Sequence, residues 1–401
     1  MTIGCPECGA LEDIPPLTAR SYARCRTCHY PLERRSGRSL SAALACTTAT
    51  FVLLFPANLA PLMSVHMLGA ERSSFLSSGI VAIWNDGWVI LALLLGMFGI
   101  VLPFVRFGGL LVVLGAVRLG CRARGIGALF RWMTWLDIWT MPDVYLVGCF
   151  VGYARVTQNL TGTIGPGGYC FIAAALLSML TRASLDRRTV WRAIAAEKEL
   201  PKGEASLSCQ VCDMVEPISH EGLACPRCGL TLRARKTDAV VRAAALSLGA
   251  LILTIPANFY AMTISTQLGR DQSHRIIDGV YQLFHLGLWQ LGILIICTSI
   301  VIPVAKILGM AWFIASVWGR SRKHLRIKAH LYRWIDELGR WSYVDVFTIA
   351  AFVPLIHFDG MASAKPAIGA TAFALVIFLT MAASRAFDPR LMWDVHMRRK
   401  P

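Results

Sequence analysis

The sequence predicts an all-α protein that crosses a membrane several times, built as a parallel tandem repeat of two modules that each carry a small β-rich zinc ribbon. Three observations predict this fold. Hydrophobic residues make up 55% and charged residues 16% of the 401 residues, whereas soluble domains carry about 25% charged residues. Landmark residues recur 200 to 202 positions apart. Eight of the 13 Cys form four Cys-x-x-Cys pairs. These features exclude an ordinary soluble enzyme, a disordered chain and a secreted disulfide framework.

The repeat appears as a series of matches in the same order. A shift of 200 residues aligns 55–58 with 255–258, because each segment ends in Pro-Ala-Asn. A shift of 202 residues aligns 139–144 with 341–346, which share the pattern Trp-x3-Asp-Val. Each half also opens with two Cys-x-x-Cys pairs. Ordered coincidences of this kind indicate a tandem duplication.

Each half is expected to hold about four membrane-spanning helices. A helix needs about 20 residues to cross a hydrocarbon core of about 30 Å. The second span of each half is longer, and we expect Pro103 and Pro303 to kink it because proline removes a backbone donor. The outer loops contain amphipathic pieces at 81–88 and 276–289, which suit a membrane surface or a partner. The expected spans are 42–63, 86–117, 140–158 and 168–182 in the first half, and 240–263, 285–317, 343–358 and 367–384 in the second.

The domain boundaries follow from these spans and from the Cys pairs. A charged linker joins the halves, and we expect it to be helical around 189–199 and to end at Pro201 and Gly203. The predicted boundaries are 1–38 for the first zinc ribbon, 39–183 for the first transmembrane domain, 184–206 for the cytoplasmic linker, 207–235 for the second zinc ribbon, 236–386 for the second transmembrane domain and 387–401 for a basic cytoplasmic tail.

The distribution of Lys and Arg predicts which side of the membrane each loop faces. Of the 40 Lys and Arg, 33 lie in the termini and the segments on their side of the membrane, and four lie in the opposite loops. Cytoplasmic loops carry such an excess. We therefore expect both termini and both ribbons in the cytoplasm. The net charge of +16 then reflects topology and contact with anionic lipids, and no nucleic-acid partner is needed to explain it.

The Cys pairs have the spacing of zinc ribbons. Two tight turns that each supply two sulfurs make a tetrahedral four-sulfur site, which suits Zn²⁺, with iron as the alternative metal. A domain of about 30 residues cannot bury enough core to fold unaided, which favours a structural metal. A redox or metal-sensing switch is the alternative. We expect His29 and His220 at the surface. The predicted zinc ligands are Cys5, Cys8, Cys25 and Cys28 in the first ribbon and Cys209, Cys212, Cys225 and Cys228 in the second.

Two basic residues within the long spans are the most informative polar features. Arg106 and Lys306 each follow a proline by three residues. Charges inside spans mark functional sites unless their side chains reach the interface. Asp143 and Asp345 lie at similar depth, at the start of the third spans. We expect an Arg106–Asp143 pair and a Lys306–Asp345 pair, and both a functional and a purely structural role stay open.

The second half carries more hydroxyl groups around this depth. Ser299 lies seven residues before Lys306, and Ser342 lies three residues before Asp345, so each shares a helix face with its charged neighbour. Thr380 adds a hydroxyl from the last span. A Lys–Asp pair in such a polar cavity would bind a lipid phosphate or relay protons.

Signatures of catalysis do not occur in the sequence. It has no nucleophile–His–acid arrangement, no phosphate-binding loop and no His-x-x-x-His metal site. We therefore expect a protein that is not an enzyme.

The sequence resembles the paraquat-inducible protein A (PqiA/LetA) family of bacterial inner-membrane proteins over about residues 1–385. The resemblance rests on the ribbons and on the Pro-x-Asn, Pro-x-x-basic and Trp-x3-Asp-Val elements, which occur in this order in both halves. The resemblance implies two modules, each a cytoplasmic zinc ribbon with a four-helix membrane domain. It implies phospholipids as cargo, a periplasmic MCE-domain tunnel protein as partner, and the proton gradient as a candidate energy source. Pro142 departs from the family's pattern. The membrane residues to which the resemblance points are Lys306, Asp345, Ser299, Ser342, Thr380 and Asp143.

The main functional hypothesis is a lipid-transport subunit of an MCE system. In it, Lys306 holds a headgroup phosphate or pairs with Asp345, and Asp345 titrates if transport is coupled to protons. Two other classes stay open. A redox- or metal-responsive membrane regulator would release zinc on oxidation, and an ion-coupled exporter of small molecules would move its substrate without an MCE partner.

Overall fold

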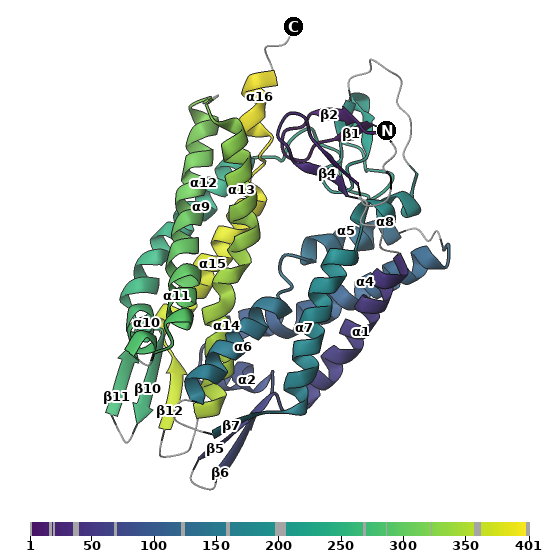
Figure 1. Cartoon of the computed structure of the whole chain (residues 1–401). Helices are drawn as coiled ribbons and strands as arrows, with labels where there is room; N and C mark the ends of the chain where they lie inside the picture. Colours follow the sequence, from purple (N-terminus) through teal and green to yellow (C-terminus); the bar gives the residue numbers. More distant parts are fainter. Residues whose placement is uncertain are drawn as a thin grey trace.

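The structure is a computed structural model, and most of the chain that it describes is helical (Figure 1). The helices of the second half repeat those of the first in order. The described residues are 2–15, 18, 21–34, 40–67, 70–121, 125–157, 161–196, 206–267, 270–285, 287–321, 323–356 and 362–397. The linker helix ends at Ile194, earlier than predicted. Pro201 and Gly203, which were expected to end it, lie outside the described residues.

The first half holds α1 (Leu40–Leu59), α2 (Ser78–Asn85), α3 (Val89–Gly96), a π-helical turn η1 (Met97–Val101), α4 (Leu102–Arg118), α5 (Ile126–Leu136), α6 (Pro142–Val156) and α7 (Pro166–Ser184), followed by α8 (Arg187–Ile194) in the linker. The second half holds α9 (Ala239–Phe259), α10 (Ile276–His285), α11 (Trp289–Ile296), the π-helical turn η3 (Cys297–Val301), α12 (Ile302–Trp318), α13 (Leu325–Leu338), the 3₁₀ helix η4 (Gly339–Tyr343), α14 (Val344–Ile356), α15 (Ile368–Ala386) and α16 (Leu391–Met397).

Five stretches of helix in the described chain are long and apolar enough to cross a membrane, and α7 with α8, bent by 65° between them, makes a sixth. The predicted third span of each half is shorter than these stretches. These two spans are the 15-residue α6 and the 13-residue α14, which at 1.5 Å per residue reach only about 20 Å. Both helices fall below the length needed to cross in the described chain, and they lie at the centre of the molecule, between the longer helices. The five stretches are Leu40–Leu59, Val89–Arg118, Ala239–Phe259, Trp289–Trp318 and Ile368–Asp394.

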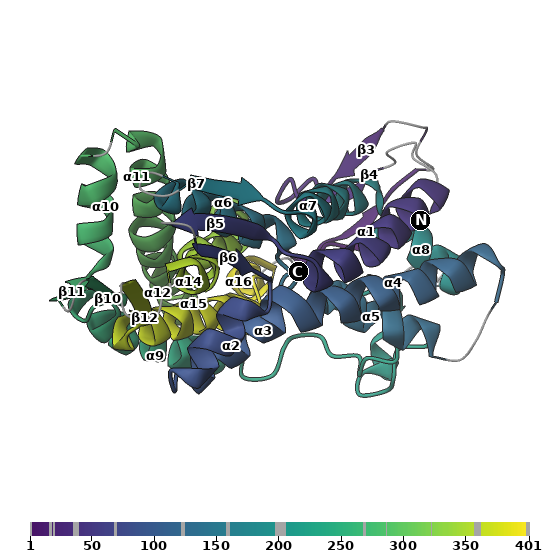
Figure 2. The same ribbon diagram turned by 90° about the horizontal axis from the view of Figure 1, so that it is seen from below.

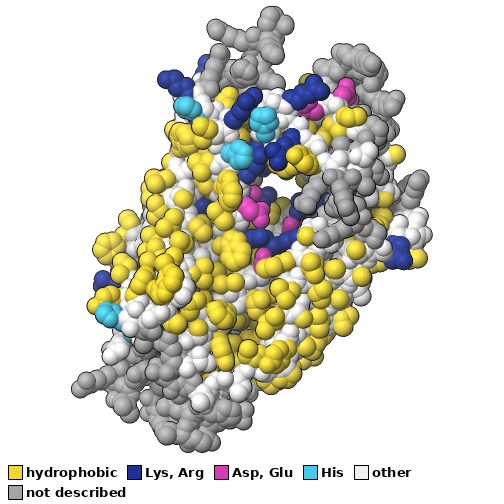
Figure 3. Space-filling view, viewed as in Figure 1, with side chains coloured by type: hydrophobic (Ala, Val, Ile, Leu, Met, Phe, Trp, Pro, Cys, Tyr) yellow, Lys and Arg dark blue, Asp and Glu magenta, His cyan; other side chains and the backbone are white. Residues whose placement is uncertain are grey.

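The two halves meet through α6 and α14, which lie between the remaining helices (Figure 2). Within the halves, α1 packs on α7 and α9 packs on α15. Gly148 of α6 permits the central contact, because an ideal Cβ at this position would lie 2.7 Å from Cβ of Phe347 in α14. Small residues allow helix backbones to approach closely in membrane proteins. Outside this centre, hydrophobic side chains cover the middle of the face seen in Figure 3, and basic side chains gather toward the ribbon end.

The predicted kinks take the form of π-helical turns. Pro103 and Pro303 are the second residues of α4 and α12, and η1 and η3 directly precede these helices. A proline lacks the N–H that would bond to the carbonyl four residues earlier, so the helix widens by one residue at this point. Each long helix nevertheless continues over 30 residues. Because π-helical turns re-aim side chains, this widening decides where Ser299 of η3 points.

At the end opposite the ribbons, each half carries a three-stranded antiparallel sheet that the sequence did not predict (Figure 1). The strand orders are β6-β5-β7 and β11-β10-β12, so the last strand of each half returns to pair with the first. The amphipathic pieces expected in the same loops are confirmed as α2 and α10. The strands are β5 (Met63–Met67), β6 (Ala70–Ser74) and β7 (Thr161–Ile164), then β10 (Thr263–Gln267), β11 (Arg270–His274) and β12 (Ala362–Pro366).

The ribbons are built from short hairpins, and each docks on the membrane helices of the other half. Residues of the first ribbon share a core with Phe313, Ala329 and Ile335 of the second half. Residues of the second ribbon share a core with Phe130 and Met133 of the first half. The modules implied by the resemblance are therefore exchanged in space. The hairpin strands are β1 (Thr2–Gly4), β2 (Leu11–Asp13), β3 (Tyr22–Arg24) and β4 (Pro31–Arg34), and β8 (Ser206–Ser208) and β9 (Val215–Pro217).

Matching arginines hold the exchanged ribbons in place. Arg131 of α5 donates to the carbonyl of Cys228 at 2.9 Å. Arg333, its counterpart at a shift of 202, donates to the carbonyl of Cys28 at 2.9 Å. Gly127 lets the second ribbon approach α5, since an ideal Cβ there would lie 1.9 Å from a ribbon carbonyl. The exchange follows the repeat symmetry and binds the two halves to each other.

Candidate functional site

Two groups of four Cys form candidate metal centres, as the sequence predicted. In each group the four Sγ atoms lie within 4.8 Å of one another and the side chains are buried. Sulfurs on opposite turns are 3.5 to 3.6 Å apart, which is close to the spacing around a tetrahedral ion with bonds of about 2.3 Å. The donor set therefore fits a four-coordinate metal with no open position.

The residue after each second Cys turns the chain in the left-handed conformation. Gly9 and Gly229 have φ of 75° and 69°, and His29 and Asp213 take the same role with φ of 59° and 55°. Glycine is favoured there because it has no Cβ. His29 is exposed and His220 bonds to Glu216 at 3.1 Å with its side chain 47% exposed, so the prediction that both His lie at the surface is confirmed.

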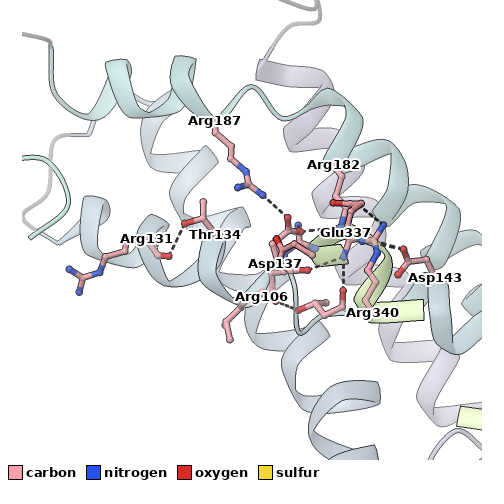
Figure 4. A network of polar contacts seen from close by, with 12 residues as sticks. Arg106, Arg131, Thr134, Asp137, Asp143, Arg182, Arg187, Glu337 and Arg340 are labelled. Carbon is pink, nitrogen blue, oxygen red and sulfur yellow. Dashed lines mark hydrogen bonds and ion pairs between the residues drawn. The ribbon is translucent and has the colours of Figure 1, made fainter. Parts of the chain in front are cut away.

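In the first half, the buried charges form a closed ion-pair cluster (Figure 4). Arg106 pairs with Asp137 at 2.5 Å, so the predicted Arg106–Asp143 pair is wrong. Arg182 of α7 joins both carboxylates, at 3.0 Å from Asp137 and 3.1 Å from Asp143. Arg340, from η4 of the second half, also reaches Asp143 at 3.6 Å. The cluster therefore ties α4, α7 and the start of α6 to the other half.

Asp137 is the centre of this cluster and lies in the loop between α5 and α6. Burial alone would raise the pKa of its carboxyl, but Arg106, Arg187 and Arg182 outweigh burial and hold the pKa below its usual value. The carboxylate is thus ionised at neutral pH. Charges that neutralise one another in this way are typical of a structural cluster, because breaking it would leave a buried charge without a partner.

In the second half, the corresponding charged side chains do not form a cluster of ion pairs among the described residues. Ser299 donates a short hydrogen bond to Asp345, and Arg155 of α6 is a cation that interacts electrostatically with the same carboxylate. The ammonium of Lys306 is buried and has no hydrogen-bond partner among the described residues. The predicted Lys306–Asp345 ion pair is therefore wrong. Asp336 acts on Lys306 from a longer distance and itself pairs with Arg385.

The remaining predicted residues surround the same region. Ser342 of η4 is buried, and its hydroxyl has no partner among the described residues. Thr380 of α15 is buried and donates to the carbonyl of Ile377 at 2.9 Å. Because η4 packs against α12, α15 and η3, the structure brings Ser299, Lys306, Ser342 and Thr380 to one part of the second half.

Gly339 is the residue that sequence reasoning missed here. An ideal Cβ at Gly339 would lie 2.9 Å from Nζ of Lys306, so the ammonium lies against this backbone position and would have to shift if a side chain were present. The shift of 202 that aligns the repeats places Gly339 on Asp137, the partner of Arg106. The same shift places Ser384 on Arg182. Extending the repeat alignment to these positions would have shown that the second half lacks the acid and the arginine that complete the ion-pair cluster of the first half.

The model of the family described as Paraquat-inducible protein A matches residues 40–195 and 240–397 of the chain. The chain belongs to this family. It is 26% identical to the intermembrane transport protein PqiA of Escherichia coli (strain K12), over 97% of this chain and 95% of that protein. It is 27% identical to the lipophilic envelope-spanning tunnel protein A of the same strain, over 98% and 91%. It is also 25% identical to a probable intermembrane transport protein of Haemophilus influenzae, over 99% and 96%.

No solved structure matches the chain. The two matched segments of the Paraquat-inducible protein A family each cover one half, which confirms the tandem repeat. Together with the long apolar helices and the two Cys clusters, they show a multi-pass membrane protein of a transport family.

Proposed function

We propose that this protein moves phospholipids between the bacterial inner membrane, in which it is embedded, and a periplasmic MCE-protein tunnel. Its relatives are named as an intermembrane transport protein and a lipophilic envelope-spanning tunnel protein, and these names support movement of lipophilic cargo. The excess of Lys and Arg on the ribbon side supports a cytoplasmic position for the ribbons and both termini. The role is not enzymatic, and the predicted domain boundaries are part of the proposal.

The observation that carries this proposal is the buried ammonium of Lys306, which has no acidic partner in contact within the described ranges. A buried cation without a carboxylate is costly unless a ligand brings the opposite charge. A lipid phosphate would supply that charge, with the hydroxyls of Ser342 and Thr380 as further donors. Asp345, buried beside Ser299, is the group that would bind and release a proton if transport is coupled to the proton gradient.

The two Cys clusters would hold one Zn²⁺ each. The ion would act as a structural staple, because the short hairpins of each ribbon bury little core of their own. The ribbon residues then keep the exchanged arrangement in place through Arg131 and Arg333.

Mass spectrometry of the full chain, purified in mild detergent, tests the composition of this complex. We expect zinc at both clusters, bound phospholipid and an MCE-domain protein in the same preparation. Zinc with neither lipid nor partner would contradict the transport role.

Transfer of labelled phospholipid from proteoliposomes to the co-purified MCE protein tests the residues. Lys306→Ala and Asp345→Ala should each lose transfer while their membrane levels stay normal. Lys328→Ala is a matched control, because this lysine of α13 already donates to Ser316 and Ser321. Full transfer in both Lys306→Ala and Asp345→Ala would overturn the assignment of the site.

A further inference from the structure

A cavity of about 760 Å³ opens between the two halves near the ribbon end. Its floor is apolar and comes from both halves: Phe98 of η1 and Trp139 on one side, and Leu246 of α9 and Phe378 of α15 on the other. The rings form a continuous surface, since Trp139 lies 5.5 Å from Phe98 and 5.3 Å from Phe378. This apolar cavity is separate from Lys306 and Asp345, neither of which lines it.

The rim of the cavity is basic. Its basic lining residues are Arg233, Lys236, Arg242 and Arg385, and no Asp or Glu lines it among the residues that the structure describes. Arg385 is paired with Asp336, which lies outside the lining. Within the described part of the chain, the guanidinium groups of Arg233 and Arg242 have no ion-pair partner, and both residues are exposed. The cavity therefore offers positive charge that the protein itself leaves uncompensated.

Neighbouring cavities differ in charge. Two cavities of about 560 and 1090 Å³ share Gln210 and Arg385 with this one, but their linings include Asp336 and Glu337. Figure 3 shows the resulting hollow at the ribbon end, with acidic and basic side chains at its edge. Acidic and basic side chains nearly balance in those two linings, whereas the cavity between the halves has a purely basic rim among its described lining residues, so an anion is favoured there.

The depth of these residues matches an amphiphile that lies along the helices. Arg242 is one turn from the start of α9, and Leu246 is one further turn, about 6 Å, into the membrane-spanning part. Arg385 is at the end of α15, and Phe378 lies two turns, about 10 Å, deeper. Charge at the boundary and apolar surface further in is the arrangement of a phospholipid headgroup and its acyl chains.

The repeat equivalent of this site carries different residues, although the fold is duplicated. The repeat shifts place Ala42 at the position of Arg242 and Thr298 at that of Phe98. They place Glu337 at the position of Trp135, which lines the cavity, whereas Trp341 keeps the ring of Trp139. The equivalent positions therefore lack the cation and part of the apolar surface.

We propose that this cavity binds a membrane phospholipid with a phosphate headgroup, taken from the leaflet on the ribbon side, with the phosphate at Arg233 and Arg242 and an acyl chain against Phe98, Trp139 and Phe378. The inference rests on the proposed lipid transport and adds the point at which lipid enters the protein.

Photolabelling of the full chain tests the site. The protein, with its ribbons intact, is placed in phosphatidylcholine nanodiscs containing phosphatidylglycerol with a photoreactive acyl chain, and the labelled peptides are identified by mass spectrometry. We expect labelling at the ends of α9 and α15 that line the cavity. The double variant Arg233→Gln/Arg242→Gln should lower it about 25-fold, since each basic residue near the surface contributes about a fivefold attraction for anionic lipid. Diacylglycerol with the same photoreactive chain lacks the phosphate, and it should label the wild-type protein as weakly as phosphatidylglycerol labels the double variant.

Two further variants make the result specific. Arg118→Gln removes a cation at the end of α4, away from the cavity, and should leave the labelling unchanged. Ala382→Trp fills the cavity but keeps its rim charges, and should abolish the labelling. Equal labelling of wild type and the double variant, or label spread evenly over the lipid-facing helices, would overturn the proposal.

The result also separates this inference from the proposed function. If both are correct, Lys306→Ala loses transfer and keeps the label. If the cavity is labelled but Lys306→Ala transfers phospholipid normally, only the assignment of Lys306 is wrong. Transfer that depends on Lys306 without label at the cavity would break only this inference.

Discussion

In the first half of the molecule, Arg106 forms an ion pair with Asp137, and Arg182 pairs with both Asp137 and Asp143. In the second half, Lys306 faces Gly339 at the position of Asp137, and Ser384 stands at the position of Arg182. The long helices, the matching Pro103 and Pro303 and the π-helical turns occur in both. One copy thus uses its buried charges to hold the fold, and the other keeps a buried cation and carboxylate whose charges the protein does not neutralise by direct pairing.

Restoring the lost acid should convert the second half into the first. Gly339→Asp places a carboxylate beside Lys306, and we expect phospholipid transfer to fall by on the order of 100-fold, because the new buried pair competes with the phosphate. Gly339→Asn is the matched control for size, and should retain about ten times more transfer than the aspartate. Equal transfer in the two variants would mean that space, and not charge, matters at this position.

Removing the acid from the first half should affect stability. Asp137→Ala leaves Arg106 and Arg182 without their shared partner, at a cost of about 3–5 kcal/mol. Thermal unfolding in detergent should then shift downward by about 10 °C. The double variant Arg106→Met/Asp137→Leu removes both charges and should recover most of this loss. An unchanged melting temperature in Asp137→Ala would show that the cluster is not structural.

Disrupting one metal centre should loosen the opposite half. Cys5→Ser/Cys8→Ser should raise hydrogen exchange in α13 by about tenfold and leave α5 unchanged, because the first ribbon covers the second half. Cys209→Ser/Cys212→Ser should do the reverse. Hydrogen exchange read by mass spectrometry distinguishes these patterns, and increased exchange on the ribbon's own half would contradict the exchanged arrangement.

The smallest expected effect concerns pH at the basic rim. Burial lowers the pKa of Lys236 to about 8, and nearby Asp388 compensates only in part. The ammonium is therefore charged below about pH 8 and neutral above it, so phosphatidylglycerol labelling should fall about twofold between about pH 7 and about pH 9. Lys236→Arg should remove this dependence, and an unchanged profile in wild type would exclude Lys236 from the site. The other charged groups that act on Lys236 are Arg385, Arg390 and Asp336.

The predictions that were correct and those that were wrong differ in the range of the interactions on which they depend. The long apolar runs form long helices, the Cys pairs form two buried four-sulfur groups, and the amphipathic pieces form α2 and α10. Each of these features depends on residues close together in the chain. The outer strands were missed because segments such as β7 are four residues long and mostly polar. Their structure comes from pairing with β5, a strand nearly 100 residues earlier.

The two predicted ion pairs failed for the same reason. Arg106 and Asp143 lie at similar depth, but depth does not decide which of two carboxylates a guanidinium reaches. The loop after α5 brings Asp137 to Arg106, and η4 brings Gly339 to Lys306.

Periodicity, composition and repeat spacing were enough to define the membrane helices, the duplication and the two groups of four Cys that could hold a metal, because these properties are set by neighbours along the chain and by contact with lipid. Only the folded molecule decides which half each ribbon covers, which buried charges are neutralised, and where a basic rim meets an apolar cavity. Each of these joins residues from both halves, and their partners are selected by packing across the α6–α14 interface and not by local sequence.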